Sequence, residues 1–441
     1  GIYAVLSLLG LGLLVWGYGQ VRETPTWIWI PPLGMRHASW LFNLLAFILS
    51  SMLVKVRLAK RMALWLILRF GRKASWALMA FVIIQMVLAP LIPATAARAV
   101  MTLPLMIVVA AIYGATEEHN NNFGRNLFLL NLVGISVLSS MTMTGSSANL
   151  IAVGLIQTMG GERVYYMDWV RVGAPIAILT TMMMWWLGQK LVFPISAQDR
   201  LPQLEGGLGL VERQYAELGP LRREEKKAIA IFGLVLFLWM TDALHMGWFG
   251  VEISAPFAAL LGAVLVLFPR YGVMQWAEAE IPWHLLIFSA GAYAGGLALD
   301  DTGAAEWGVR MLFGGMDLKG VPFGVSYTVI IAVMMYSHLL TTSKTVRTLI
   351  LLPIIITMAK ALGWPPIAFA LPAALCIDWV VGLPISGKPN VILFSTNQYS
   401  VADNFKYGVL TCTLGVILLV VSGATWFHWL GLTPSFWAVA P

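Results

Sequence analysis

The chain has 441 residues, of which 59% are hydrophobic and only 11% are charged. This composition excludes an ordinary water-soluble protein, which needs more charge on its surface, and predicts an all-α polytopic membrane protein embedded in the lipid bilayer. The formal net charge of +7 does not indicate a nucleic-acid partner, because the basic residues lie mostly in loops between apolar runs. Cys376 and Cys412 lie in apolar context, so neither a disulfide framework nor a thiolate metal site is predicted.

Apolar runs recur from the first residues to the last. Several are shorter than the roughly 20 residues that a full span needs, and Gly or Pro interrupts others, which is typical of discontinuous helices that line an internal cavity. We therefore expect about nine to eleven crossings plus re-entrant pieces. The chain begins inside an apolar run without Met or a basic segment, so we expect a truncated start rather than a signal peptide. The runs cover residues 4–16, 77–91, 127–140, 176–193, 229–240, 255–268 and 409–421.

Three motifs occur twice, in the same order, in the two halves of the chain. The first is a small polar break followed by an apolar helix, the second is a break ending in Asn149 or Asn390, and the third precedes the last long run of each half. Their offsets of 249, 241 and 235 residues indicate an internal duplication. The matched stretches are 91–104 with 340–353, 144–151 with 386–392, and 168–173 with 403–408.

Charge predicts the relative orientation of the two halves. Residues 55–73 hold seven basic residues and no acidic residue, whereas the equivalent stretch 300–319 holds four acidic and two basic residues. If short basic loops face the cytoplasm, these stretches face opposite sides of the membrane. The repeats are therefore expected to have inverted topology, with an odd number of spans in each half.

These patterns predict three regions. The first repeat covers residues 1–197 and contains scaffold helices, a re-entrant hairpin at 75–113 and a broken helix at 127–158. Residues 198–227 form a hydrophilic linker with a short surface helix. The second, inverted repeat covers residues 228–441, with a hairpin at 325–361 and a broken helix at 366–398.

Few ionisable side chains lie inside apolar segments, where their energetic cost makes each a functional candidate. They are Arg98, Lys344, Arg347, Asp378 and Lys388. The four cations lie in or beside the breaks, and together with the helix N-termini that follow they predict a buried binding site for a small anion. Neutral donors and acceptors come from Thr95, Thr144, Ser146, Ser147, Asn149, Thr342, Ser343, Thr345, Ser386 and Asn390.

Most of these candidates also have a structural interpretation. Arg98 and Arg347 would serve equally well to satisfy carbonyl groups at a hairpin end or to reach the membrane interface. Asn149 and Asn390 would cap the helices that follow them. For Asp378 we favour a buried salt bridge with one of the lysines over a proton relay.

The sequence contains no Walker loop, no Gly-x-Ser-x-Gly motif and no His spacing typical of a metal site. An enzyme is therefore not predicted, and neither a cofactor nor a metal is expected.

At these residues the chain resembles the divalent anion/sodium symporter family, which includes dicarboxylate, citrate and sulfate carriers. The resemblance extends over nearly the full length and includes residues 239–245, 281–288 and 387–408. It implies a homodimer with a scaffold domain and a transport domain that moves as an elevator. It also implies transport of a small divalent anion, a dicarboxylate being favoured, in a bacterial inner membrane. In that family the hairpin tips bind the substrate and line sodium sites.

Both hairpin tips depart from the Ser-Asn-Thr signature of the family. The first tip reads Ala94-Thr95-Ala96 and the second Ser343-Lys344-Thr345, so we expect an asymmetric site, weighted toward the second half. The Lys344 ammonium would lie close to where sodium would bind, and Lys388 adds a second charge. We therefore favour a sodium-independent anion exchanger or a proton-coupled carrier. Sodium-coupled symport, and an antiporter that uses Asp378 for ion coupling, are the alternatives.

Overall fold

The computed structural model describes residues 38–204, 207–251, 253–284, 286–287, 290–291, 302, 320–341 and 343–440. Within these residues every regular element is a helix, as the sequence predicts, and β-strands are absent. The predictions for residues 4–16, for Leu285 and Phe288 within 281–288, and for 300–319 apart from Thr302 concern positions outside the described ranges.

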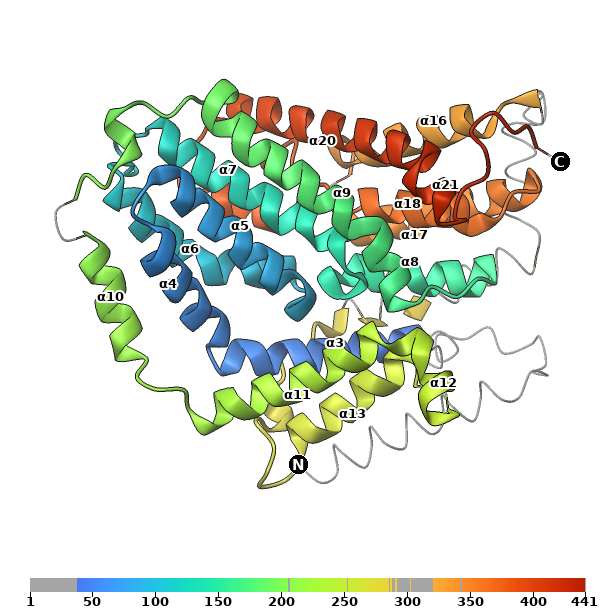
Figure 1. The fold of residues 1–441 in the computed structure, drawn as a ribbon, viewed down its shortest axis with the longest axis horizontal. Helices are drawn as coiled ribbons and strands as arrows, with labels where there is room; N and C mark the ends of the chain where they lie inside the picture. Colours follow the sequence, from blue (N-terminus) through green and yellow to red (C-terminus); the bar gives the residue numbers. More distant parts are fainter. Residues whose placement is uncertain are drawn as a thin grey trace.

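One group of helices packs along one side of the molecule (Figure 1). It consists of α3 (Ala38–Lys55), α11 (Arg223–Met240) and α13 (Ala255–Leu267), with the short α12 (His245–Phe249) following α11 after a 59° bend. Trp239 of α11 packs edge-on against Phe42 of α3, and its indole N–H donates to the carbonyl of Ala255 at the start of α13. We call these helices the α3–α11–α13 group.

Helix α4 (Leu58–Phe70) leads from this group to the rest of the first half (Figure 1). The chain bends by 55° between α3 and α4, and Arg57 at the bend has the left-handed φ of 58°. A hairpin of α5 (Ala74–Leu91) and α6 (Thr95–Ile112) follows, and then α7 (Asn122–Val137), the broken segment 138–146, α8 (Ser147–Leu155) and α9 (Tyr166–Leu187). Helix α10 (Gly207–Glu217) lies in the predicted linker and packs against α4.

The C-terminal part of the chain repeats this order of elements. Helices α16 (Phe323–Tyr336) and α17 (Lys344–Ala361) form the second hairpin, and α18 (Pro366–Cys376), the break 377–387 and α19 (Lys388–Phe394) form the second broken helix. The long α20 (Val401–Ala424) and the short α21 (Trp426–Trp429) follow. Helix α17 packs against α8, and α19 packs against α6, so each half contributes to the surroundings of the other.

Two glycines and two aspartates show that the third matched motif has the same structural role in both halves. Asp168 and Asp403 each accept a hydrogen bond from the backbone N–H three residues earlier, at the starts of α9 and α20. A Cβ atom at Gly173 would overlap the carbonyl oxygen of Ser140, and one at Gly408 would overlap that of Val381. Each last long helix therefore uses a glycine to approach the backbone of its broken helix closely.

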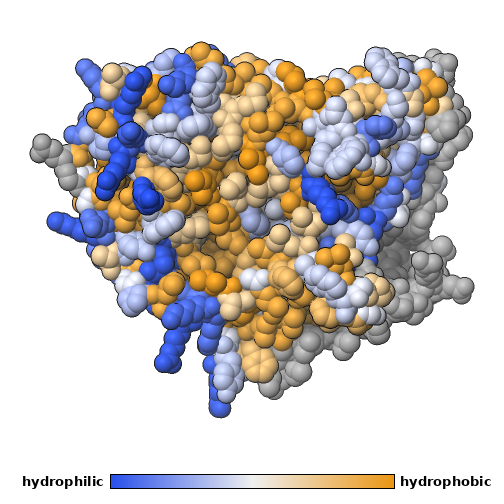
Figure 2. Space-filling view, viewed as in Figure 1, coloured by the Kyte–Doolittle hydropathy of each residue, from blue (hydrophilic) through white to orange (hydrophobic). Residues whose placement is uncertain are grey.

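Five helical segments in the described residues are long and apolar enough to cross a membrane, or seven if each bent pair counts as one span. This count covers the described residues alone, so the expected nine to eleven crossings stay a prediction. Figure 2 shows a broad apolar surface over the middle of the molecule, with hydrophilic side chains gathered toward the end where α4 and α10 lie. Large apolar side chains such as Phe237, Phe257 and Ile350 are about half exposed, which suits contact with lipid tails.

Candidate functional site

The first hairpin tip and the first broken helix are joined by Arg98. Pro93 lacks an amide hydrogen and holds Ile92 in an extended conformation, so the chain turns there and α6 begins at Thr95. Arg98, one turn into α6, is fully buried, and its Nη2 donates to the carbonyls of Ile135 (3.2 Å) and Gly145 (3.0 Å) and to the Ser139 hydroxyl. Its Nε and Nη1 atoms have no hydrogen-bond partner in the described residues.

Arg347 has the equivalent place in the second half. Its Nη1 donates to the carbonyl of Ile377 (3.2 Å), at the start of the second break, and its Nη2 donates to the carbonyl of Met334 (2.6 Å) in α16. Its Nε donates to the Ser337 hydroxyl at 2.9 Å. Both arginines thus place a buried cation against oxygens that a break or a helix end leaves without an intrahelical donor.

Asn149 and Asn390 hold the two breaks in the same way. The Nδ2 group of Asn149 donates to the carbonyls of Ser139 (2.9 Å) and Thr142 (3.1 Å), ten and seven residues earlier. Asn390 donates to Val380 (2.8 Å) and Leu383 (2.9 Å), again ten and seven residues earlier. In both, Oδ1 is buried without a hydrogen-bond partner in the described residues. Because these free atoms are acceptors, they suit a cation, a hydroxyl group or water, not the oxygen of an anion.

Lys344 and Asp378 form a buried ion pair at the second tip. Ser343 accepts a hydrogen bond from the backbone N–H of Val346 and so caps α17, which places Lys344 as the first residue of the helix. The Lys344 Nζ lies 3.2 Å from Asp378 Oδ1, and the side chains are 12% and 0% exposed. Asp378 Oδ2 has no hydrogen-bond partner among the described residues.

The two breaks meet each other. The indole N–H of Trp379, next to Asp378, donates to the hydroxyl of Ser140 in the first broken helix at 3.1 Å. Arg98 of the first half is close enough to Asp378 of the second for their charges to interact. The structure therefore gathers Arg98, Lys344 and Asp378 into one buried charged cluster at the junction of the halves.

The other residues predicted for the site differ in their contacts and in their exposure. Thr144 donates to the carbonyl of Pro90 at 3.1 Å and contacts the Tyr166 hydroxyl, so it fixes the break against α5 and α9. Ser146 caps α8 by accepting from the N–H of Asn149. Ser386 and Thr345 are buried, Thr95 and Ser147 are half-buried, and Lys388 is exposed at the first turn of α19. Thr342 lies outside the described residues.

Sequence reasoning missed the residues that connect these candidates. Ser139 and Ser140 end an apolar run, where hydroxyl groups carry no distinctive spacing. His338 accepts from the N–H of Gly382 at 3.1 Å, so its Nδ1 carries the proton and donates to the carbonyl of Met335 at 2.7 Å. Its place directly before the second tip was the available signal that it connects hairpin and break.

The cluster supplies cations and polar hydrogen atoms. Within the residues that the structure describes, no group of three or more His, Cys, Asp or Glu side chains is arranged to hold a metal ion. The unpaired N–H groups of Arg98 and the Lys344 ammonium are suited to bind the oxygens of a carboxylate or oxyanion.

Comparisons with known proteins agree with this chemistry. The family model described as "Sodium:sulfate symporter transmembrane region" matches residues 35–433. A "Sodium-dependent dicarboxylate transporter SdcS" of Staphylococcus saprophyticus is 28% identical over 395 residues, 85% of this chain and 74% of that protein. The protein of the same name from Staphylococcus aureus is 25% identical over 394 residues, with the same coverage. A "Membrane protein" of Cupriavidus necator is 25% identical over 410 residues, 90% of this chain and 77% of that protein.

The family match covers most of the chain, including both hairpins and both broken helices, and it confirms the resemblance noted in the sequence. The family match therefore identifies the protein as a transporter and not an enzyme. The chain belongs to the sodium:sulfate symporter family of divalent anion transporters and is an integral membrane protein that moves a small anion across the membrane.

Proposed function

We propose that this protein is a secondary active transporter of a small divalent anion, with a dicarboxylate as the favoured substrate, in a bacterial inner membrane. The buried cluster of Arg98, Lys344 and Asp378 at the junction of the two breaks carries the proposal. A buried ammonium and a guanidinium with unpaired N–H groups are costly unless an anion offsets them. Two relatives are named dicarboxylate transporters, which supports the substrate class.

The anion is proposed to compete with Asp378 for the Lys344 ammonium. Asp378 Oδ1 holds Lys344 at 3.2 Å, and its other oxygen has no partner in the described residues, so the ion pair is only half satisfied by hydrogen bonds. A substrate carboxylate can accept hydrogen bonds from both Lys344 and the free N–H groups of Arg98, whereas Asp378 accepts a hydrogen bond from Lys344 alone. Asp378 then serves as an internal counter-ion that stabilises the empty carrier.

Transport is proposed to be independent of sodium, by anion exchange or proton coupling. The arginine and asparagine N–H groups already bind carbonyl oxygens of Ile135, Gly145, Ile377 and Val380, the kind of oxygen that would otherwise coordinate a cation. A sodium ion about 4 Å from a guanidinium would also be repelled by roughly 4 kcal/mol at an effective dielectric constant of about 20. In this proposal the protein's own cations replace the sodium ions.

Sodium coupling is the second candidate, and a specific observation favours it. Asn149 Oδ1 and Asn390 Oδ1 are buried acceptors without partners in the described residues, and the SdcS relatives are named sodium-dependent. Such oxygens suit a cation. Sodium-dependent uptake that is lost in both Asn149→Ala and Asn390→Ala would favour this candidate over exchange.

Proton-coupled antiport that uses Asp378 is the remaining alternative. The free Oδ2 of Asp378 supports it, because a carboxyl group with an unpaired oxygen can take up a proton. This alternative predicts that Asp378→Asn abolishes transport whereas Lys344→Asn retains it. The anion-exchange proposal predicts that Lys344→Asn is the more damaging change.

An elevator mechanism and a homodimer are proposed from the family resemblance. The α3–α11–α13 group lies along one side of the hairpins and broken helices and contacts them through α8 and α9, and this arrangement supports a division into scaffold and transport parts (Figure 1). Helix α4, which connects them across a bend, would accommodate the relative motion.

The direct test of the proposed site is binding of a labelled dicarboxylate to purified Lys344→Asn protein. We expect at least a tenfold loss of affinity, because a charge-assisted hydrogen bond contributes about 1.5–3 kcal/mol. The control is Lys190→Gln, which removes an exposed lysine in the π-helical turn that follows α9. Unchanged affinity in Lys344→Asn would exclude Lys344 as a ligand.

A further inference from the structure

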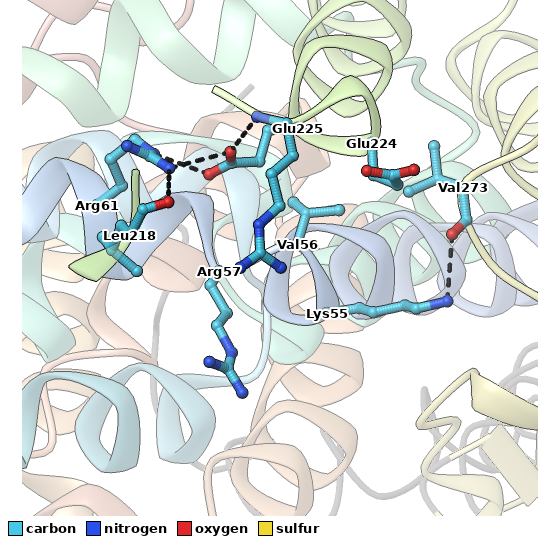
Figure 3. A pocket seen from close by; sticks show the side chains of 9 residues that line it. Lys55, Val56, Arg57, Arg61, Leu218, Glu224, Glu225 and Val273 are labelled. Atoms are coloured by element: carbon cyan, nitrogen blue, oxygen red, sulfur yellow. Dashed lines mark hydrogen bonds and ion pairs between the residues drawn. The ribbon is translucent and has the colours of Figure 1, made fainter. Parts of the chain in front are cut away.

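A pocket of about 340 Å³ lies at the bend between α3 and α4, beside the start of α11 (Figure 3). Its charged lining consists of Lys55, Arg57, Arg61, Arg222, Glu224 and Glu225. We call it the hinge pocket. Four basic residues against two acidic ones leave the lining with an excess of two positive charges.

Two of the four cations are already neutralised. Arg61 forms a bidentate ion pair with Glu225, with Nε–Oε1 and Nη2–Oε2 distances of 2.8 and 3.1 Å, and its Nη1 donates to the carbonyl of Gly219. Lys55 Nζ lies 2.6 Å from Glu278 Oε2 and donates to the carbonyl of Val273. These two ion pairs leave Arg57, Arg222 and the Glu224 carboxylate, so the unpaired part of the lining has a net charge of +1.

The side chains of the other two cations, Arg57 and Arg222, are exposed and form no hydrogen bond or ion pair in the part of the chain that the structure describes, although the charge of Arg222 interacts with that of Glu225. Figure 3 shows the Arg57 side chain pointing away from the carboxylate of Glu225. Arg57 also has a φ of 58°, a left-handed conformation that costs a residue with a Cβ free energy and that glycine or asparagine adopts more readily. An arginine at this position therefore calls for an explanation in its side chain.

We propose that the hinge pocket binds a phosphate group between Arg57 and Arg222. Guanidinium groups match the geometry of phosphate oxygens and bind them in pairs of hydrogen bonds. Residues 55–73 are basic without an acid, which predicts that the bend faces the cytoplasm, where acidic phospholipids are abundant. Val56, Leu218 and Val273 give the pocket apolar walls beside its charges. The phosphate comes either from a lipid headgroup or from a soluble phosphate ester.

The pocket is separate from the anion site at the hairpin tips and goes beyond the transport function. A ligand held by Arg57 at the α3–α4 bend and by Arg222 at the start of α11 would bridge α4 and the α3–α11–α13 group. It would fix the angle between them. A phosphate-bearing ligand in the hinge pocket would thereby act on the relative position of the two groups of helices.

The test measures the thermal stability of the purified full chain with separate additions of phosphatidylglycerol, phosphatidylcholine, glycerol 3-phosphate and inorganic phosphate. We expect phosphatidylglycerol to raise the melting temperature and phosphatidylcholine to have little effect. A matching rise with glycerol 3-phosphate or inorganic phosphate identifies a soluble source, and a rise with phosphatidylglycerol alone identifies a lipid.

The decisive variant is Arg57→Gly. Glycine adopts the left-handed conformation without strain, so the unliganded protein should be as stable as wild type or more stable, and misfolding cannot explain a loss of binding. We expect Arg57→Gly and Arg222→Gln each to weaken phosphate binding about tenfold. The control Arg223→Gln/Lys226→Gln removes two charges from the same turn of α11, outside the pocket, and should bind as wild type does.

The variant Lys344→Asn distinguishes the hinge pocket from the transport site. Its melting temperature should still rise with the phosphate ligand, whereas its binding of dicarboxylate should be lost. Three results would overturn the inference. The first is a melting temperature that no phosphate compound changes. The second is an equal rise in melting temperature in wild type and Arg57→Gly. The third is a dicarboxylate-induced rise in melting temperature that depends on Arg57.

Discussion

The buried side chains of each break act on the backbone before they act on a ligand. Arg98, Arg347, Asn149 and Asn390 each donate to carbonyl oxygens at a break. The sequence predicted that these positions are equivalent and that they have either a binding or a structural role. It could not assign the hydrogen-bond partners, because which carbonyl oxygens the side-chain N–H groups reach depends on the path of the backbone through the break.

The asparagine clamps can be tested by isosteric change. Asn149→Asp and Asn390→Asp keep Oδ1 but replace the Nδ2 donor, so two buried carbonyls lose their partner. Each change should lower the free energy of unfolding by roughly 2–4 kcal/mol, measured by thermal or denaturant unfolding of the purified protein. A variant as stable as wild type would show that the Nδ2 contacts do not hold the break.

Removal of the counter-ion Asp378 should change the affinity for a dicarboxylate in the opposite direction from removal of Lys344. Asp378→Asn removes the carboxylate that competes for Lys344 while keeping nearly the same shape. The affinity for a dicarboxylate should therefore rise by about tenfold, as measured by titration calorimetry. The empty protein should lose stability, because the Lys344 ammonium then lacks its counter-ion. A fall in affinity would instead assign Asp378 a direct role in holding the substrate or a proton.

At the scale of helices, the close contacts of α9 and α20 depend on single glycines. Gly173→Ala would force the new Cβ into the carbonyl of Ser140, and Gly408→Ala would force it into that of Val381. Neither neighbour is the flexible end of a side chain. We expect each variant to lose about 2–3 kcal/mol of stability and to show a similar loss in both halves.

Gly233→Ala is the matched control for these two changes. Gly233 lies within α11, and a Cβ there meets nothing within 4 Å. The substitution should leave stability unchanged or raise it by about 0.5–1 kcal/mol, because alanine favours the helix. Equal effects at Gly173, Gly408 and Gly233 would contradict the close packing described for the two broken helices.

The sequence predicts hairpins and breaks where proline, glycine and hydroxyl residues interrupt apolar runs. The predicted hairpins at 75–113 and 325–361 fall on the helix pairs α5–α6 and α16–α17. The bend between α3 and α4 was not predicted. Its turn residue is Arg57, and an arginine gives no signal for a left-handed backbone.

At the scale of the whole molecule, the sequence predicted the class, the family and the order of elements, but not how the halves meet. The contacts of α17 with α8, and of Trp379 with Ser140, join residues about 200 positions apart or more. Such pairings follow from how apolar surfaces fit, which periodicity does not specify. The pairing of Asp378 with Lys344 was open for the same reason, since Lys388 was an equally good partner in the sequence.

The division into the α3–α11–α13 group and the body of hairpins and broken helices places the charged cluster in the body. Arg98, Lys344, Arg347 and Asp378 would therefore move together if the body moves past the scaffold. An empty carrier would carry a net positive charge across the barrier, whereas a bound dianion would offset it. This difference is the physical reason to expect exchange rather than uptake by an empty carrier.

Coupling in proteoliposomes tests this account most directly. Uptake of a labelled dicarboxylate would be measured with external sodium, with choline in its place, and with or without unlabelled dicarboxylate preloaded inside. We predict that uptake requires the internal anion or a proton gradient and is the same in sodium and choline. Uptake that strictly requires sodium and ignores the internal anion would contradict the replacement of sodium by Arg98, Arg347 and Lys344.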